Sequence, residues 1–286
     1  MSRILNALHL SAEEPGFKEF SLEDAPLEEM PIQDAPALPC RDLPLNGLSS
    51  VFSVQPSISP QSRLEALTNP GDFAAEQFRV LGARLEHLAE TRLLKTLLVT
   101  SATFREGKSL VSLNLAISLA QRSGKKVLLV EGDLRKPALC HMLGLPRLRG
   151  FSDWLHCEQP LTDFLCGLAG LDLWLLPAGE SCEKPLADAQ SVRLNELPKQ
   201  ADKHFDWIVI DSSPLLVADA SVLSRVADGT LVVVRQGSTE KKALQRSLPS
   251  LEKVLGFVFN DASSINPRDY KQYYSPAKSN GRFAAA

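Results

Sequence analysis

Residues 98–109 read Leu-Val-Thr-Ser-Ala-Thr-Phe-Arg-Glu-Gly-Lys-Ser, and this stretch decides the fold. It predicts a buried strand, a turn that contains Gly107, and then the start of a helix. Such a unit directs backbone N–H groups and a helix N-terminus toward one point, as a polyphosphate requires. We therefore expect nucleotide binding, with Gly107 allowing close approach of the backbone. Lys108 would reach the β- and γ-phosphate oxygens, and the Ser109 hydroxyl would bind the Mg²⁺ of the nucleotide.

Carboxylates stand at the ends of two further apolar runs. Glu131 and Asp133 follow residues 127–130, and Asp211 follows residues 207–210. In an open parallel sheet the ligand crevice lies at the carboxyl ends of the strands, so these acids are candidates for handling a metal ion or water. Glu131 and Asp133 alternate along the chain and are expected to point to opposite faces.

The composition is that of an enzyme with one large core. The 286 residues are 44% hydrophobic and carry a net charge of −3, so no basic surface suggests nucleic-acid binding. The sequence has no apolar run of about 18 residues and no leader pattern at Met1, which predicts a cytoplasmic chain without direct membrane insertion. The five cysteines lack metal-ligand spacing, which suits a reducing compartment.

The chain divides into three predicted parts. Residues 1–70 are acidic and proline-rich and are expected to form a disordered arm. Residues 71–262 carry the phosphate turn and the acidic motifs and should form the nucleotide-binding domain. Residues 263–286 are expected to form a flexible tail that contains tyrosines.

Strands and helices alternate within the predicted domain. The strands are continuous apolar runs, which indicates burial on both faces. An α/β fold follows, with a doubly wound, mostly parallel sheet and helices on both faces. The expected strands lie near 95–102, 125–133, 171–177, 205–212, 229–235 and 254–260, and the expected helices near 73–91, 108–122, 191–202, 219–226 and 240–252.

Together these motifs resemble one family. The chain is similar over residues 73–274 to the cytoplasmic bacterial tyrosine kinases of capsule and exopolysaccharide synthesis, P-loop ATPases related to the septum-site and partitioning ATPases. The resemblance implies ATP and Mg²⁺ as cofactors. The motifs that carry it are Glu76-Gln77-Phe78-Arg79, the turn at 102–109, Asp133-Leu134-Arg135-Lys136-Pro137, Gly150-Phe151-Ser152-Asp153, Leu176-Pro177-Ala178-Gly179, Asp211-Ser212-Ser213-Pro214 with Asp219, and Gly256-Phe257-Val258-Phe259-Asn260.

The same resemblance implies a set of site residues. The first acid of its motif would lie near the metal and the attacking oxygen, the second would contact the metal shell, and Asp211 would order metal-bound water. Asn260 would recognise adenine. The catalytic set is Lys108, Glu131, Asp133 and Asp211; the metal set is Ser109, Glu131, Asp133 and Asp211; the nucleotide set is Thr103, Phe104, Arg105, Glu106, Gly107, Lys108, Ser109, Leu110, Arg135 and Asn260.

The three tyrosines of the chain are Tyr270, Tyr273 and Tyr274, all beyond the last expected strand. Random placement would rarely put all three within five residues, and in the family such a tail is the autophosphorylation substrate. The ten residues from Asn260 to Tyr270 can extend up to roughly 35 Å, so reach alone leaves attack within the same chain open. The resemblance implies attack on a neighbouring subunit in a ring. It also implies activation by a cytoplasmic segment of a membrane chain-length regulator, which would recruit the chain to the inner face of the plasma membrane.

Several positions depart from the family pattern. Ala102 replaces the first glycine of the turn, Phe104 and Arg105 replace Pro-Gly, and Glu131 replaces an aspartate. Gly82 replaces the second arginine of a Glu-x-x-Arg-x-x-Arg motif for subunit contacts, so ring assembly is less strongly predicted than ATP binding.

Two other functions stay open. One is a nucleotide-binding regulator of the polysaccharide machinery that lacks kinase activity, as the altered turn allows. The other is a spatial-positioning ATPase, although Thr103 stands where those proteins carry a signature lysine, five residues before Lys108.

Overall fold

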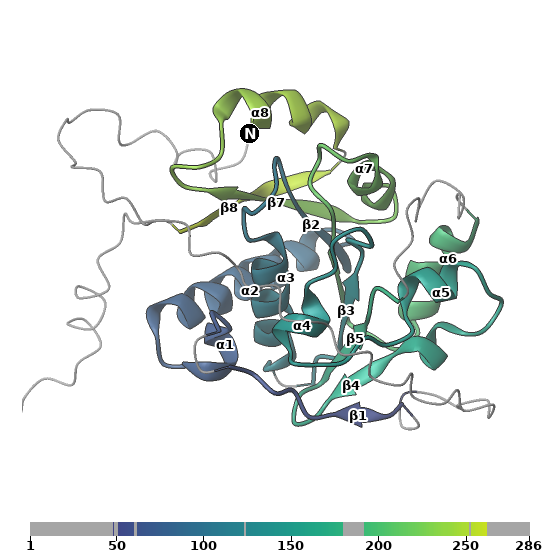
Figure 1. The fold of residues 1–286 in the computed structure, drawn as a ribbon. Coiled ribbons are helices and arrows are strands. Elements are labelled where there is room, and N and C mark those ends of the chain that lie inside the picture. The colour runs from purple at the N-terminus through teal and green to yellow at the C-terminus, as the bar shows by residue number, and fades with distance from the viewer. Residues whose placement is uncertain are drawn as a thin grey trace, which may run out of the picture. The chain divides into compact units, whose positions relative to one another are not determined.

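The computed structural model describes residues 48, 51–59, 62–122, 124–179, 192–251 and 253–261. The described strands form one sheet in the order β1-β4-β5-β3-β6-β2-β7-β8, in which every pair is parallel except β4 with β5 (Figure 1). The predicted α/β architecture with a mostly parallel sheet is confirmed. The strands are β1 (Ser53–Val54), β2 (Thr96–Ser101), β3 (Val127–Glu131), β4 (Cys166–Leu168), β5 (Leu173–Leu176), β6 (Trp207–Asp211), β7 (Gly229–Arg235) and β8 (Val254–Asn260).

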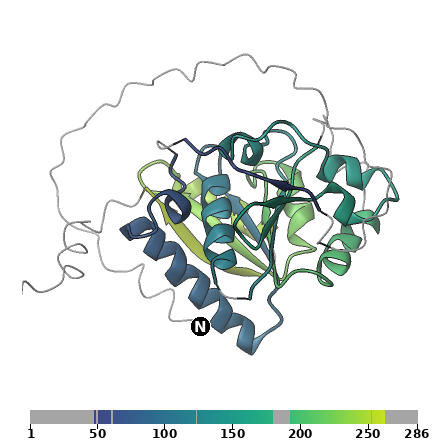
Figure 2. The same cartoon turned by 90° about the horizontal axis from the view of Figure 1, so that it is seen from below.

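Helices cover both faces of this sheet (Figure 2). The alternating side chains of β2, β3, β5 and β6 enter two separate apolar layers, as Leu97 and Leu98 of β2 illustrate. Leu97 packs with α2 and α3, whereas Leu98 packs with the layer that α5, α6 and α7 cover. The helices are α1 (Glu65–Thr68), α2 (Phe73–Thr91), α3 (Lys108–Ala120), α4 (Leu139–Met142), α5 (Phe151–Leu155), α6 (Val192–Ala201), α7 (Ala218–Ser224) and α8 (Lys241–Ser247), with 3₁₀ turns η3 (Leu161–Phe164) and η4 (Leu248–Ser250).

The strand order brings the sequence motifs together. β6 lies between β2 and β3, and Asp211 at its end is in register with Val99 of β2 and with Glu131 of β3. The phosphate turn after β2 and the acids at or after the ends of β3 and β6 therefore lie at one edge of the sheet, because the carboxyl ends of these parallel strands meet there.

The domain begins earlier than the predicted boundary at residue 71. Within the segment assigned to the arm, β1 pairs with β4 in parallel, and α1 buries Ala66 against the core. The Asn114 side chain of α3 holds this segment: its Oδ1 accepts from the Ala66 N–H at 3.1 Å, and its Nδ2 donates to the Arg63 carbonyl at 3.0 Å. Residues 1–47 and the tail 262–286 lie outside the described residues.

The structure differs from the sequence expectations in two details. The short strand β4 and its antiparallel pairing with β5 were not predicted. The helix expected over 240–252 ends at Ser247, because Pro249 has no N–H to continue the helical bonds and the chain turns into η4. Among the described helices, none has both the length and the apolar character needed to cross a membrane.

Candidate active site

The turn between β2 and α3 has the backbone of a phosphate cradle. Gly107 has φ 88°, a conformation that side-chain-bearing residues rarely adopt, and a Cβ built there would lie 2.0 Å from the Nδ2 of Asn260. Arg105 also adopts a positive φ of 61°, which costs a residue with a side chain about 1 kcal/mol. Because α3 begins at Lys108, the unpaired N–H groups of its first turn adjoin this backbone.

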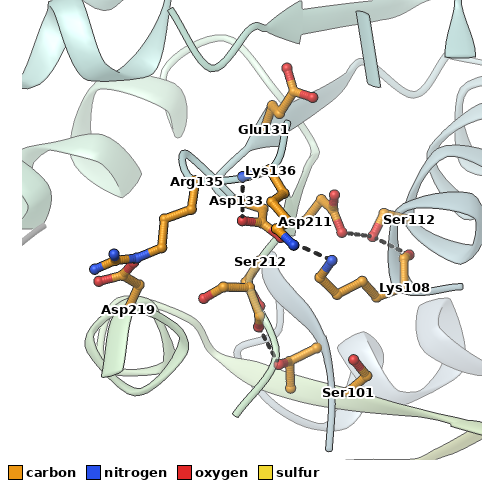
Figure 3. A network of polar contacts seen from close by, with 12 residues as sticks. Ser101, Lys108, Ser112, Glu131, Asp133, Arg135, Lys136, Asp211, Ser212 and Asp219 are labelled. Atoms are coloured by element: carbon orange, nitrogen blue, oxygen red, sulfur yellow. Dashed lines mark hydrogen bonds and ion pairs between the residues drawn. The ribbon is translucent and has the colours of Figure 1, made fainter. Parts of the chain in front are cut away.

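Lys108 lies against the acidic motif that follows β3. Its Nζ is 3.0 Å from Oδ2 of Asp133, and only 14% and 5% of the two side chains are exposed. The other oxygen of Asp133 accepts a hydrogen bond from the N–H of Lys136 at 3.1 Å. Figure 3 shows the Lys108 side chain reaching toward Asp133, with Asp211 nearby. The ion pair therefore joins the phosphate turn to the motif of residues 133–137.

Asp211 completes this group from the end of β6. Its side chain is fully buried, and Oδ1 accepts from the Ser112 hydroxyl of α3 at 3.1 Å (Figure 3). Oδ2 is buried and has no hydrogen-bond partner among the described residues. Burial raises the pKa of Asp211 to about 7, although the Lys108 charge and the Ser109 hydroxyl act to lower it.

Glu131 is oriented differently. Its two oxygens accept from backbone N–H groups, Oε1 from Leu139 at 2.5 Å and Oε2 from Ala178 at 3.0 Å. Burial raises the pKa of this carboxyl group, and the backbone hydrogen bonds oppose that rise. In Figure 3 the carboxylate points away from Lys108 and Asp133. The structure thus brings Lys108, Asp133 and Asp211 together, whereas the Glu131 carboxylate is used to hold two loops.

The remaining nucleotide candidates surround the turn. Arg135 pairs through Nε with Asp219 of α7 at 2.9 Å (Figure 3). Phe104 is 50% exposed, with Nζ of Lys136 5.4 Å from its ring centroid. Asn260 uses Nδ2 to donate to the Glu106 carbonyl at 3.0 Å, and its Oδ1 accepts from the Asp261 N–H at 3.0 Å. Its amide is therefore already engaged at the edge of the turn.

Two residues beside the site, Ser112 and Thr239, lie outside the sequence motifs. Ser112 lies four residues after Lys108, so helical spacing alone would have placed it on the same face of α3. Thr239 reaches Glu106 from the loop after β7, with 2.7 Å between its hydroxyl and Oε1, and no sequence pattern indicates that contact. The predicted phosphoacceptors Tyr270, Tyr273 and Tyr274 lie outside the described residues.

No family model matches the chain, but its sequence is similar to those of known proteins. It is 32% identical over 218 residues to the tyrosine-protein kinase YwqD of Bacillus subtilis, covering 74% of this chain and 92% of that protein. Identity to the tyrosine-protein kinase CpsD of Streptococcus pneumoniae is 31%, over 58% of this chain and 76% of the relative.

A solved structure agrees with these relatives. The kinase domain of the Escherichia coli tyrosine kinase ETK superposes with a TM-score of 0.62 at 27% identity, covering 76% of this chain and 93% of that domain. The sequence similarity extends over nearly the whole of YwqD, and the fold is that of a kinase domain of the same kind. The chain therefore belongs to the bacterial tyrosine-protein kinases.

Proposed function

We propose that the chain is an ATP-dependent protein-tyrosine kinase that phosphorylates its own C-terminal tyrosines. The observation that carries the proposal is the convergence of Lys108, Asp133 and Asp211 on a glycine-containing turn at the N-terminus of α3. This arrangement supplies one cation, two carboxylates and a row of backbone donors. Those are the groups that phosphoryl transfer requires, because its transition state needs positioning and charge stabilisation more than covalent help.

The residues present fit Mg²⁺ and a nucleotide. Asp211 offers a buried Oδ2 without a hydrogen-bond partner among the described residues, and the Ser109 hydroxyl lies near it at the start of α3. Hard cations prefer such oxygen ligands, so Ser109, Asp211 and Asp133 would hold the ion. When bound, ATP supplies the phosphoryl group and Mg²⁺ offsets its charge.

Lys108 and Asp133 would change partners as the nucleotide enters. The phosphates would compete for the Lys108 ammonium, which leaves Asp133 free of its ion pair. A tyrosine hydroxyl with a pKa of about 10 is protonated at neutral pH, so a carboxylate that accepts its proton would contribute about 10²- to 10⁴-fold. Asp133 is the acid that we assign to this role, since it adjoins both Lys108 and the open edge.

We assign Glu131 a positioning role instead of a place among the metal ligands. Its carboxylate holds the N–H groups of Leu139 and Ala178, so it fixes the loops that follow β3 and β5. The methylene that distinguishes it from the family's aspartate gives it the reach to do so. Asp133 and Asp211 then carry the metal chemistry.

The backbone of residues 103–110 would contact the nucleotide on one side. Arg135 would contact it on the other side. Asn260 would reach adenine only through the hydrogen-bonding capacity that its two internal bonds leave, one N–H and one lone pair. The domain that carries these residues would extend to residue 262. Residues 263–286 would present the acceptor tyrosines to a neighbouring copy.

The cellular role follows from the family. We propose that the kinase regulates capsule or exopolysaccharide polymerisation or export. A membrane chain-length regulator would recruit it to the inner face of the plasma membrane through a cytoplasmic segment. That segment would also complete the active site, so the isolated chain is expected to turn over slowly.

The test is transfer from γ-labelled ATP with Mg²⁺, with and without the cytoplasmic segment of the candidate regulator. Label in the protein that disappears in Lys108→Ala and in the Tyr270/Tyr273/Tyr274→Phe variant is the expected result. Release of inorganic phosphate without protein label would favour a positioning ATPase instead. Nucleotide binding without either product would favour a regulator that lacks activity.

A further inference from the structure

Glu106 is a buried carboxylate inside the predicted phosphate turn. It is 1% exposed and directly precedes Gly107. A negative charge at this place repels a polyphosphate, and repulsion is strong where water is excluded. A residue that opposes ligand binding by its charge needs another reason to be there, and its hydrogen bonds supply one.

The Glu106 side chain closes the turn on itself. Oε2 accepts from the N–H of Ala102 at 3.0 Å, and Oε1 accepts from the Thr103 hydroxyl at 2.7 Å. Both donors belong to the first residues of the turn, and the carboxylate belongs to its end. Arg105, between them, has the unfavourable φ of 61°. The hydrogen bonds of Glu106 therefore stabilise a backbone that Arg105 alone would not adopt.

Glu106 also ties the turn to the ends of two strands. The Thr239 hydroxyl, which follows β7, donates to Oε1 at 2.7 Å and itself accepts from the Arg235 N–H at 2.9 Å. The Glu106 carbonyl accepts from Nδ2 of Asn260 at the end of β8. The turn is thus held both from within and by the neighbouring strands.

We propose that Glu106 is a positioning residue that, with Thr239, holds the phosphate turn in its ligand-accepting shape before the nucleotide binds. This inference deepens the proposed function and rests on it. A preformed turn spares the ligand the cost of ordering the loop, which raises affinity without a new contact. Loss of the Glu106 carboxylate must then weaken nucleotide binding, whereas the change in charge alone would strengthen it.

The experiment measures the dissociation constants of MgADP and of magnesium tripolyphosphate by calorimetry on the full chain. Thr239→Val removes the hydroxyl at nearly constant shape, and Thr239→Ser is the matched control that keeps it. We expect Thr239→Val to weaken both ligands about tenfold and Thr239→Ser to stay within about twofold of the parent. Glu106→Ala should weaken both ligands at least as much.

Two results would overturn the inference while leaving the proposed function intact. One is unchanged binding in Thr239→Val together with tighter binding in Glu106→Ala, which would leave charge as the main effect of Glu106. The other is weaker MgADP with unchanged tripolyphosphate, which would assign the network to base recognition. Thermal melting without ligand identifies variants that fail to fold. If the parent chain binds neither ligand, the proposed function fails, and this inference fails with it.

Discussion

At the scale of single residues, the carboxylates of this site differ by what their oxygens already hold. Both oxygens of Glu131 accept backbone N–H groups, whereas Asp211 keeps one buried oxygen without a partner among the described residues. The same carboxylate group therefore has two roles in this site: in Glu131 it anchors loops, and in Asp211 it is available to bind a ligand. The sequence placed both acids correctly at strand ends, but it contained no information about which backbone donors would reach them.

Glu131→Gln is expected to affect stability more than ligand binding. The amide can accept from only one of the two N–H groups, Leu139 or Ala178, and its own NH₂ then faces the other. We expect the free energy of unfolding to fall by about 2 kcal/mol, because a buried donor is left unpaired. Denaturant titration measures that loss, and calorimetry should show MgADP affinity changed by less than about threefold.

Glu131→Asp is the matched control for this prediction. It keeps the charge and restores the residue usual in the family, but the shorter side chain cannot span both amides, so an intermediate loss of stability is expected. Unchanged stability of Glu131→Gln, combined with loss of Mg²⁺-dependent nucleotide binding, would contradict the positioning role and indicate that Glu131 is a metal ligand.

Asp211 predicts a pH dependence of stability. Its pKa rises from 3.8 to about 7 on folding, so the folded state holds the proton more tightly. The stability that this carboxyl contributes is complete below about pH 4 and is lost as the pH rises through 7. Asp211→Asn cannot lose a proton, so its melting temperature without nucleotide should exceed that of the parent at pH 8 and approach it at pH 5. Parallel melting curves from pH 5 to 8 would contradict the assignment.

At the scale of elements, α2 was predicted to its end residues and β1 and β4 were not. The apolar spacing of residues 73–91 continues for 19 residues, enough for periodicity to define the helix. β1 and β4 have only two and three residues, and their pairing depends on contacts distant in sequence. The site shows the same difference between local and distant contacts. The motifs at strand ends could be predicted from the sequence, but the contacts of Thr239 and of the loop anchors depend on the tertiary structure.

The contacts of α2 at Glu76, Arg79 and Gly82 are relevant to self-association, because these are the positions of the family's subunit-contact motif. Gly82 is buried against α3, and a Cβ there would lie 3.4 Å from Cδ2 of Leu119. Glu76 and Arg79 pair with each other, and Nη1 of Arg79 also donates to the Pro70 carbonyl at 2.6 Å. Within the chain, Glu76 and Arg79 of the family's subunit-contact motif are thus paired on the partly exposed surface of α2, and the third position, Gly82, is buried. Self-association through this motif receives no support from these contacts.

Gly82 provides a direct test of this packing. Gly82→Ala should stabilise the fold by up to about 1 kcal/mol, because alanine favours the helix and meets Leu119 at an ordinary contact distance. Gly82→Arg restores the family residue but forces a charge between α2 and α3, so we expect a lower melting temperature. A stable Gly82→Arg variant that assembles into a ring in analytical ultracentrifugation would contradict the burial described for this position.

At the scale of the whole molecule, the sheet order explains why distant motifs act together. β6 separates β2 from β3, so the turn of residues 102–109, the motif of residues 133–137 and Asp211 converge at one edge. β7 and β8 extend this edge and supply Thr239 and Asn260. The alternation of strands and helices in the sequence predicted the fold class. The order of the strands in the sheet determines which residues meet at the site.

The most direct test of the central claim is peptide mass spectrometry of the full chain after incubation with MgATP and the cytoplasmic segment of the regulator. The account predicts phosphate on Tyr270, Tyr273 and Tyr274 in the parent chain and none in Lys108→Ala alone. Lys108→Ala mixed with the triple tyrosine variant should regain tail phosphate if transfer occurs between copies. Nucleotide binding by the parent with unmodified tail tyrosines under all of these conditions would contradict the assignment as a tyrosine autokinase.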